Sequence, residues 1–533
     1  RLFMLEEIIF NYKLYYILII NISKKMKNKN GTKITNNKEN KNPKNIKLSR
    51  CYRLFLFFIM MNMDLTMDIS SGIFSSSAKN IKTQLKLTDA KFGGFGTATS
   101  IGRIISSFLF FFINEKVNHK YFLTIIIGFH SFFLFCFKFT NNVQILLLIR
   151  TFQGLTQTSP SIYFPVWINQ FGIHEYKTIQ ISSIQLFQAL GKLAGHFIVF
   201  LVGFDNWQNG FLISGSYLVI LNFCCIISNE KYFRRTLYAK KKDLNENNGD
   251  NTDANNSICT VFEEHEDKET NVDRNYFTNL YLLFHNPLYI ISLICRSIIR
   301  GLITCLHYWL SDFMRNVVQC DPFTITISYA IICISGPLGG IIANYLLKPV
   351  LGSYESRKAS WPLVILQIIA SVFGIGIGLM KQVLSITIVT IIFLIFNSSV
   401  IALIQGILIS CVDKSLSGTG FAFANACTQI LTAGPTPMVY GVINDKFKEK
   451  YPWLAMSCIM SINLIAVPLL MYLAILRNKK FDEELRNEKD KEKELIDIEQ
   501  ENKEDLNVND NNDFSNEDEN YENNSDNTSD KNN

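Results

Sequence analysis

The chain has 533 residues, of which 48% are hydrophobic and 18% are charged, and its formal net charge is +6. Three polar segments, 21–50, 229–275 and 478–533, contain too few apolar residues to form a core. Because no soluble domain remains to carry a basic face, the positive charge does not indicate nucleic-acid binding. The twelve cysteines lack metal-ligand spacing, so we expect neither a metal site nor a cofactor.

Twelve apolar segments form two groups of six around one polar loop. A hydrocarbon core of roughly 30 Å needs about 20 consecutive apolar residues. These segments lack strand-like alternation, and lipid tolerates no unpaired backbone, so only helices fit. The sequence therefore predicts an all-α membrane protein with twelve transmembrane helices in two six-helix bundles. We place the helices at 51–73, 92–113, 121–139, 143–168, 178–203, 207–228, 287–313, 323–347, 360–380, 384–411, 416–443 and 453–476.

Polar and apolar segments divide the chain into five parts. Basic residues are more frequent in the loops on the side of the leader, which predicts that both termini are cytoplasmic. Residues 8–22 are a short apolar run, for which a targeting segment, an additional anchor and a gene-model artefact stay open. We expect a Lys/Asn-rich leader, a first six-helix bundle, a polar cytoplasmic loop, a second six-helix bundle and an acidic disordered tail at 1–50, 51–228, 229–286, 287–476 and 477–533.

Two aspartates, Asp64 and Asp68, lie one helical turn apart in the first predicted helix and so share one face. Two carboxylates that face one cavity suit the binding of a proton or another cation. In the alternative, Asp68 lies at the membrane interface and only Asp64 is buried. We assign the binding of a coupling cation to Asp64 and Asp68, with protons as the candidate ion.

The fourth predicted helix carries Arg150, Gln153 and Gly154 near its start. An arginine in lipid costs roughly 2.5–3.5 kcal/mol on insertion scales, so Arg150 should face protein or water. Gly154 allows a neighbouring helix to approach, and Gln153 offers a hydrogen bond inside the bundle. This R-x-x-Q-G pattern, together with the 6+6 layout and the long central loop, resembles a signature of the major facilitator superfamily.

A second superfamily signature belongs in the turn between the second and third helices. Here Glu115-Lys116 resembles its acid–base pair, but Asn118 and His119 stand where glycine and arginine are expected. The resemblance implies a gating turn formed by Glu115, Lys116 and Lys120, although the signature is degraded.

Further segments resemble the Spinster-like branch of this superfamily. They are Thr156–Pro160, Glu355–Leu363 and Ala433–Asp445. That branch places a glutamate in the fourth helix where this chain has Gln157. Because glutamine cannot release a proton, proton coupling and facilitated diffusion both stay open. The resemblance implies a lipid-derived amphiphile, such as a lysophospholipid or a sphingoid phosphate, with a small organic anion or a sugar as the alternative.

The predicted helices contain more cationic side chains than the two aspartates of the first helix can neutralise. Arg296 and Arg300 share one face of the seventh helix, and Arg103 and Lys192 add positive charge. A bound anion would complete the balance, whereas ion pairs with aspartates such as Asp312 or Asp413 are the alternative. As substrate-binding residues we predict Arg150, Gln157, Arg296, Arg300 and Gln429.

Glycine and proline predict where helices approach and bend. Gly191 and Gly195 form a G-x-x-x-G pattern for close helix crossing, and Pro435 and Pro437 interrupt the eleventh helix. No metalloprotease, phosphate-loop or nucleophile-elbow motif is present, so we predict no enzyme activity. We predict a monomeric secondary transporter that works by alternating access in a plasma or organelle membrane. A receptor or scaffold that kept the fold and lost transport is the rival.

Overall fold

The computed structural model describes a set of ranges that covers most of both predicted bundles. Within them the chain is helical and contains no strand, which confirms the all-α prediction. Nearly all of the predicted leader, and most of the polar loop and of the tail, lie outside the described residues. The ranges are 50–113, 117–172, 177–233, 281, 283–342, 357, 360–411, 417–483, 485–487 and 489.

Six long helices form the first half of the molecule. A short helix, α3 (Ala78–Leu85), joins the first two of them, and 3-10 turns follow three others at Phe137–Phe139, Phe204–Asn206 and Glu230–Tyr232. We call the side of the membrane on which α2 begins the near face and the opposite side, where α3 lies, the far face. The long helices are α2 (Arg50–Ser76), α4 (Asp89–Ile113), α5 (His119–Cys136), α6 (Val143–Phe171), α7 (Lys177–Val202) and α8 (Trp207–Ile227).

The second half also crosses the membrane six times. Its eleventh crossing is divided: α16 (Ser417–Thr428) passes into a π-helical turn at Gln429–Ala433, and α17 (Pro435–Phe447) follows. The last crossing starts with α18 (Leu454–Ser461) and continues as helix from 463 to 483. The other helices are α11 (Pro287–Asn316), α12 (Pro322–Ile341), α14 (Ser360–Leu379) and α15 (Val383–Ser410).

Side-chain caps fix where several helices begin. Asn118 and Asn142 each accept a backbone N–H from the first turn of α5 and α6, at 3.1 and 2.9 Å. Asn286 and Asp321 cap α11 and α12 in the same way, and each precedes a proline at the first helical position. A cap of this kind satisfies backbone donors that have no partner within the helix.

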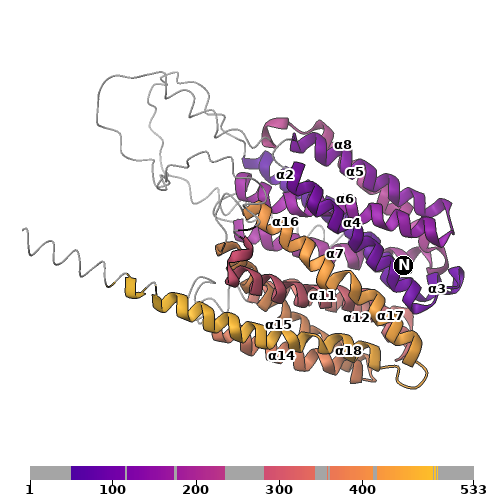
Figure 1. Ribbon diagram of the computed structural model, residues 1–533. Helices are drawn as coiled ribbons and strands as arrows, with labels where there is room; N and C mark the ends of the chain where they lie inside the picture. Colours follow the sequence, from indigo (N-terminus) through magenta and orange to yellow (C-terminus); the bar gives the residue numbers. More distant parts are fainter. Residues whose placement is uncertain are drawn as a thin grey trace, which may run out of the picture.

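The two halves repeat one pattern of helix contacts. In the first half α2 packs on α7, α4 on α6 and α5 on α8. In the second half α11 packs on α16 and α17, α12 on α15 and α14 on α18. In each half, therefore, the first crossing contacts the fifth, the second contacts the fourth and the third contacts the sixth. Between the halves, α4 contacts α16 and α17, α7 contacts α12, and α2 contacts α11. Figure 1 shows the halves side by side, the first in indigo and magenta and the second in rose to yellow.

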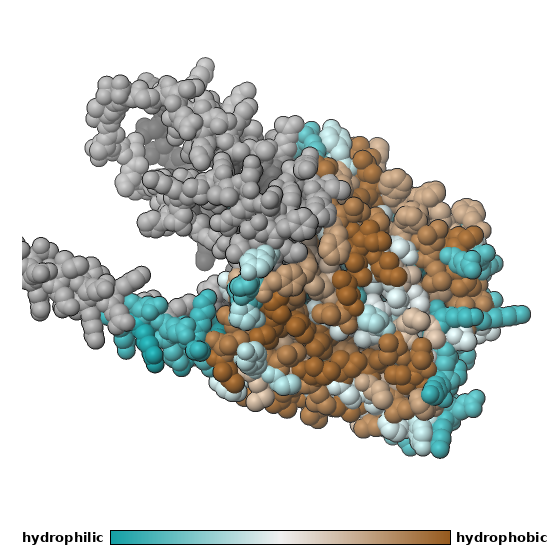
Figure 2. Space-filling model, in the orientation of Figure 1, coloured by the Kyte–Doolittle hydropathy of each residue, from teal (hydrophilic) through white to brown (hydrophobic). Residues whose placement is uncertain are grey.

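Apolar side chains cover the sides of this helical body. In Figure 2 brown surface lies between teal ends, one of them formed by the helix that continues past α18. Nine described helices are long and apolar enough to cross a membrane by length and composition. The other three crossings, α4, α6 and the divided eleventh, are not among these nine, and all three line the cavity described below.

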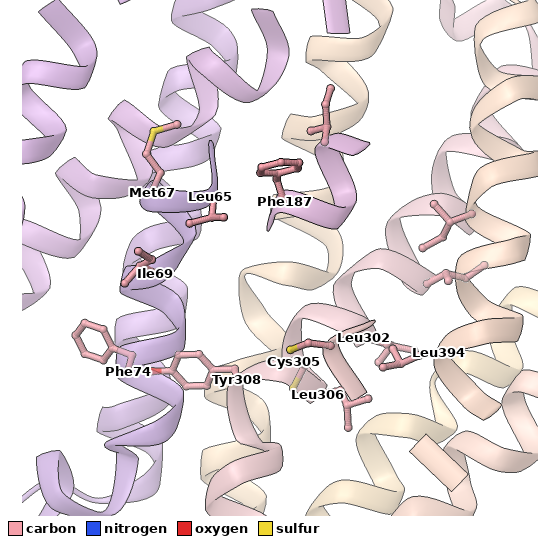
Figure 3. Packing of buried hydrophobic residues seen from close by; sticks show 14 of the residues in the cluster. Leu65, Met67, Ile69, Phe74, Phe187, Leu302, Cys305, Leu306, Tyr308 and Leu394 are labelled. Atoms are coloured by element: carbon pink, nitrogen blue, oxygen red, sulfur yellow. The ribbon is translucent and has the colours of Figure 1, made fainter. Parts of the chain in front are cut away.

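Glycines set the closest helix contacts. A side chain at Gly191 or Gly195 of α7 would collide with the backbone of α2 at Leu65 and Ile69, so the predicted G-x-x-x-G contact is present. Gly102 and Gly154 bring α4 and α6 together in the same manner. The apolar core continues from α2 through α11, and Figure 3 shows Phe74 of α2 and Tyr308 of α11 at this junction.

Candidate functional site

A polar cavity of about 260 Å³ lies between the two halves. Its described lining comes from both: α2, α4, α6 and α7 on one side, and α11, α12, α15, α16 and α17 on the other. Near-face portions of the helices contribute Pro165, Gln405 and Phe421, whereas His307, Tyr308 and Pro437 line it toward the far face. The cavity therefore occupies the path that a solute would take between the bundles.

Three polar side chains of the first half form a bridge in the cavity wall. Arg103 Nη2 donates to Gln157 Oε1 at 2.8 Å, and Gln157 Nε2 donates to Asp68 Oδ1 at 2.9 Å. Asp68 is buried, so the aspartate predicted as the interfacial alternative lies inside the bundle. Gln157 was predicted as a substrate ligand, but both its carbonyl oxygen and its amide nitrogen already form hydrogen bonds with protein side chains.

Asp64 lies next to this bridge but is not among the lining residues of the cavity. Ser161 approaches Asp64 Oδ1 at 3.5 Å, and Asp64 Oδ2 is buried with no partner among the described residues. Both predicted cation-binding aspartates are therefore within the bundle, and only Asp68 reaches the cavity.

Arg296 has the most elaborate polar surroundings on the opposite wall. Its guanidinium donates to Thr428 Oγ1 at 3.0 Å and to Asn425 Oδ1 at 2.9 Å, and lies 5.4 Å from the ring of Phe421. Arg296 is only 1% exposed, and its Nε has no partner in the described part of the chain. Asn425, Thr428 and Phe421 were not predicted, because neutral residues in an apolar helix carry no signal without the position of the arginine.

Arg150 of the R-x-x-Q-G pattern faces the interior of the protein and not the lipid, as we expected from the sequence. Its Nη1 donates to Gln153 Oε1 at 2.9 Å, and its guanidinium lies 4.1 Å from the ring of Phe74. Arg150 is buried, lines the cavity, and its Nε lacks a described partner. Quadrupole attraction to an aromatic ring stabilises a buried cation only in part.

Positive charge dominates the cavity. Asp68 is the one carboxylate among its described lining residues. Structural salt bridges were the predicted alternative for the cations of the cavity. Among the described residues, however, the ion pairs are all formed by other side chains. Asp312 pairs with Lys82 instead, and Asp413 lies outside the described residues. Five cations line the cavity: Arg103, Arg150, Lys192, Arg296 and Arg300.

Gln429 lies at the start of the π-helical turn and lines the cavity. Its side-chain carbonyl is buried without a described partner, so it can accept a hydrogen bond. Carbonyls freed near the two prolines are used within the protein: Ala433 and Gly434 accept from Ser100 and Thr97 of α4, at 3.3 and 2.8 Å. The interruption of the eleventh crossing therefore binds α4 of the other half.

The predicted gating turn is only partly described. Glu115 and Lys116 lie outside the described residues. Lys120 is in the first turn of α5, where its Nζ lies 5.9 Å from the ring of Tyr121. Lys120 does not line the cavity.

Aromatic residues close the cavity toward the far face. Tyr308 Oη donates to the carbonyl of Phe92 at 2.7 Å, and Trp309 Nε1 donates to that of Pro437 at 3.0 Å. The Phe92 ring lies 5.3 Å from Tyr308 and 5.4 Å from Trp309. Because α4 and α11 belong to different halves, the contacts of Phe92 with Tyr308 and Trp309 hold the halves together on this side.

Comparisons with known proteins agree with this architecture. The Major Facilitator Superfamily profile matches residues 54–436. A bacterial homologue of the human lysosomal transporter Spinster, solved in an inward-facing and unoccupied conformation, has a TM-score of 0.61 at 12% identity, covering 82% of this chain and 98% of that one. The nucleoside transporter NupG gives a TM-score of 0.53 at 13% identity, covering 81% and 99%. A search of the curated proteins finds no match.

Two repeated six-helix halves around a central polar cavity define a secondary transporter of small solutes rather than an enzyme. The profile match over most of the length shows that the chain belongs to the Major Facilitator Superfamily. At 12% and 13% identity the solved structures share the fold, and they leave the solute of this chain to be argued from its own cavity.

Proposed function

We propose that the protein transports an anionic amphiphile, a lysolipid with a phosphate headgroup being the best fit, by alternating access. The observation that carries this proposal is the excess of cationic side chains: five line the cavity, against one lining carboxylate, Asp68, with Asp64 buried behind it. A buried charge without a counter-charge is costly, and an anionic solute that enters the cavity supplies that counter-charge.

The proposed headgroup site lies between Arg296 and Arg300, one helical turn apart on α11. Arg296 is held in place by Asn425 and Thr428 of α16, and its Nε is not used by a described residue. Guanidinium groups bind phosphate oxygens through charge-assisted hydrogen bonds. Gln429 adds a neutral acceptor for a hydroxyl group of the solute.

An acyl chain requires apolar wall, and the same cavity supplies it. Ile303, Leu394, Ile401 and Phe421 line it beside the polar groups. A cavity lined by both polar and apolar side chains suits an amphiphile better than a sugar, whose hydroxyl groups need hydrogen-bonding partners on every side.

The proposed coupling site is Asp68 with Asp64 behind it. Asp68 of α2 accepts a hydrogen bond from Gln157 of α6, which in turn accepts one from Arg103 of α4. Binding of a cation at Asp68 would weaken the first of these bonds and so loosen the connection between the three helices. We retain protons as the candidate ion and the near face as the cytoplasmic side. The protein is proposed to act as a monomer.

The test is uptake into proteoliposomes of three probes that share one oleoyl chain: lysophosphatidic acid, lysophosphatidylcholine and monooleoylglycerol. We expect saturable uptake in that order, with lysophosphatidic acid fastest, because its phosphate carries the full negative charge. Equal rates for the anionic and the neutral probe would contradict the proposed role of the cations. Empty liposomes measure the passive flux to be subtracted.

A further inference from the structure

Five ionised side chains meet at the far-face ends of α4, α11 and α17, beyond the aromatic layer that closes the cavity. They are Lys82, Asp89, Asp312, Asp445 and Lys448. Two belong to the first half and three to the second, and none of them lines the cavity. The proposed solute site therefore does not include any residue of this cluster.

Lys82 of the short helix α3 lies at the centre of the cluster. Its Nζ is 2.6 Å from Asp89 Oδ1 and 2.8 Å from Asp312 Oδ2, so one ammonium group joins carboxylates from both halves. The Lys82 side chain is 13% exposed and that of Asp312 is 2% exposed. Burial opposes the charged form of Lys82, but Asp312 and Asp89 outweigh it, and its pKa is raised. The ammonium is therefore charged at neutral pH.

The end of α17 adds a second connection to the same carboxylate. Lys448 Nζ lies 3.1 Å from Asp89 Oδ2, and Asn444 Nδ2 donates to that oxygen at 3.0 Å. Asp445 accepts the backbone N–H groups of Asp89 and Ala90 at 2.9 and 2.8 Å, which caps α4 with a residue from the other half. Asp89 is thus held by three donors, and two of them come from the second half.

Apolar rings lie directly beneath Lys82. Its Nζ lies 5.6 Å from the ring centre of Trp309 and 6.0 Å from that of Phe92, the rings that cover the far end of the cavity. Any separation of α4 from α11 and α17 that opens the cavity to the far face must therefore part Lys82 from Asp312, and Asp89 from Lys448.

We propose that Lys82 is a gating residue, which holds the far face closed by joining Asp89 of the first half to Asp312 of the second. Lys448 supports the same closure from α17. The cluster lies at the aqueous end of the helices, so water can solvate each charge when the halves part, and the gate can open reversibly. This proposal depends on the two halves and not on the identity of the solute, so the failure of either proposal leaves the other standing.

The experiment measures the distance between two spin labels across the far face, at Thr83 of α3 and at Glu449 after α17, both exposed. Labels are introduced as non-canonical residues, because the chain contains twelve cysteines. Pulsed electron resonance on the full chain in nanodiscs, without solute, gives the distance distribution. We expect a dominant short-distance population and a small long-distance fraction in the parent protein. Lys82→Met should raise the long-distance fraction by about tenfold, because the closed state loses its central contact.

Two variants control this result. Lys79→Met removes an exposed lysine from the same short helix and should leave the distribution unchanged. Lys82→Arg keeps the positive charge and should restore the short distance. An unchanged distribution in Lys82→Met, with the folded protein eluting as a single species, would overturn the proposal. If Lys82→Met fails to fold, Lys448→Met carries the test: a rise in the long-distance fraction supports the gate, and no rise contradicts it.

Discussion

At the scale of single residues, Gln157 shows how one amide side chain joins a cation and a carboxylate in the cavity wall. Its amide accepts from Arg103 and donates to Asp68, which a carboxylate at this position could not do. The sequence predicted Gln157 as a site residue but did not predict its partners. The glutamine lets Asp68 and Arg103 share one network without a direct ion pair.

Replacing Arg300 with glutamine tests the cation excess directly. The guanidinium lines the cavity, and hydrogen bonds to charged groups contribute about 1.5–3 kcal/mol, so kcat/KM for lysophosphatidic acid should fall by at least about tenfold. Uptake kinetics in proteoliposomes provide the measurement. Arg486→Gln makes the same chemical change at an exposed position and should have no effect. Unchanged kinetics in Arg300→Gln would remove this residue from the binding site.

Asp68→Asn tests the proposed coupling. A gradient of about one pH unit supplies about 1.4 kcal/mol per proton, which is up to about tenfold in accumulation. We expect the parent protein to respond to such a gradient and Asp68→Asn to be indifferent to it, with Glu449→Gln as the exposed control. Accumulation that follows the gradient in Asp68→Asn would show that another group carries the ion. Indifference of the parent protein would argue against proton coupling and for facilitated diffusion.

The sequence predicted which residues face the cavity better than it predicted their partners. Arg150, Arg296 and Arg300 were predictable, because a charge within an apolar helix must turn toward protein or water. The partners were not predictable, because contact depends on how the helices are arranged. Lys82 and Asp312 are 230 positions apart, and from sequence alone Lys82 is one of several lysines in an exposed connection.

At the scale of helices, the predicted spans agree with the observed ones because membrane thickness fixes their length. The eleventh crossing is where local signals mattered most: Pro435 and Pro437 indicated an interruption. The structure places a π-helical turn at Gln429–Ala433 just before them. Its carbonyls bind α4 across the two halves, which proline positions alone could not indicate.

Gly195→Val tests the close contact of α7 with α2. A valine side chain would collide with the backbone at Ile69, and overpacking of this kind costs about 1–3 kcal/mol. The midpoint of thermal unfolding in detergent should therefore fall. Gly94→Ala is the control, because a side chain at Gly94 meets nothing within 4 Å. Equal midpoints for the parent protein and Gly195→Val would contradict the close packing.

At the scale of the whole molecule, two similar halves meet around one polar cavity. The main contacts between them lie in three places, α4 with the eleventh crossing, α7 with α12, and α2 with α11, and α6 with α16 and α3 with α11 add smaller ones. On the far face the aromatic layer and the cluster around Lys82 join the halves, whereas the cavity includes near-face residues such as Gln405 and Phe421. This asymmetry is what one state of an alternating-access cycle requires.

Counterflow in proteoliposomes tests the central claim most directly, because only a carrier whose site faces each side in turn exchanges solute. Vesicles are preloaded with unlabelled oleoyl lysophosphatidic acid and diluted into a trace of the labelled compound. The account predicts that preloading accelerates and transiently increases uptake of the label, and that excess external solute abolishes the increase. Saturable binding of the label with no counterflow would contradict it and would favour a receptor that has kept the fold.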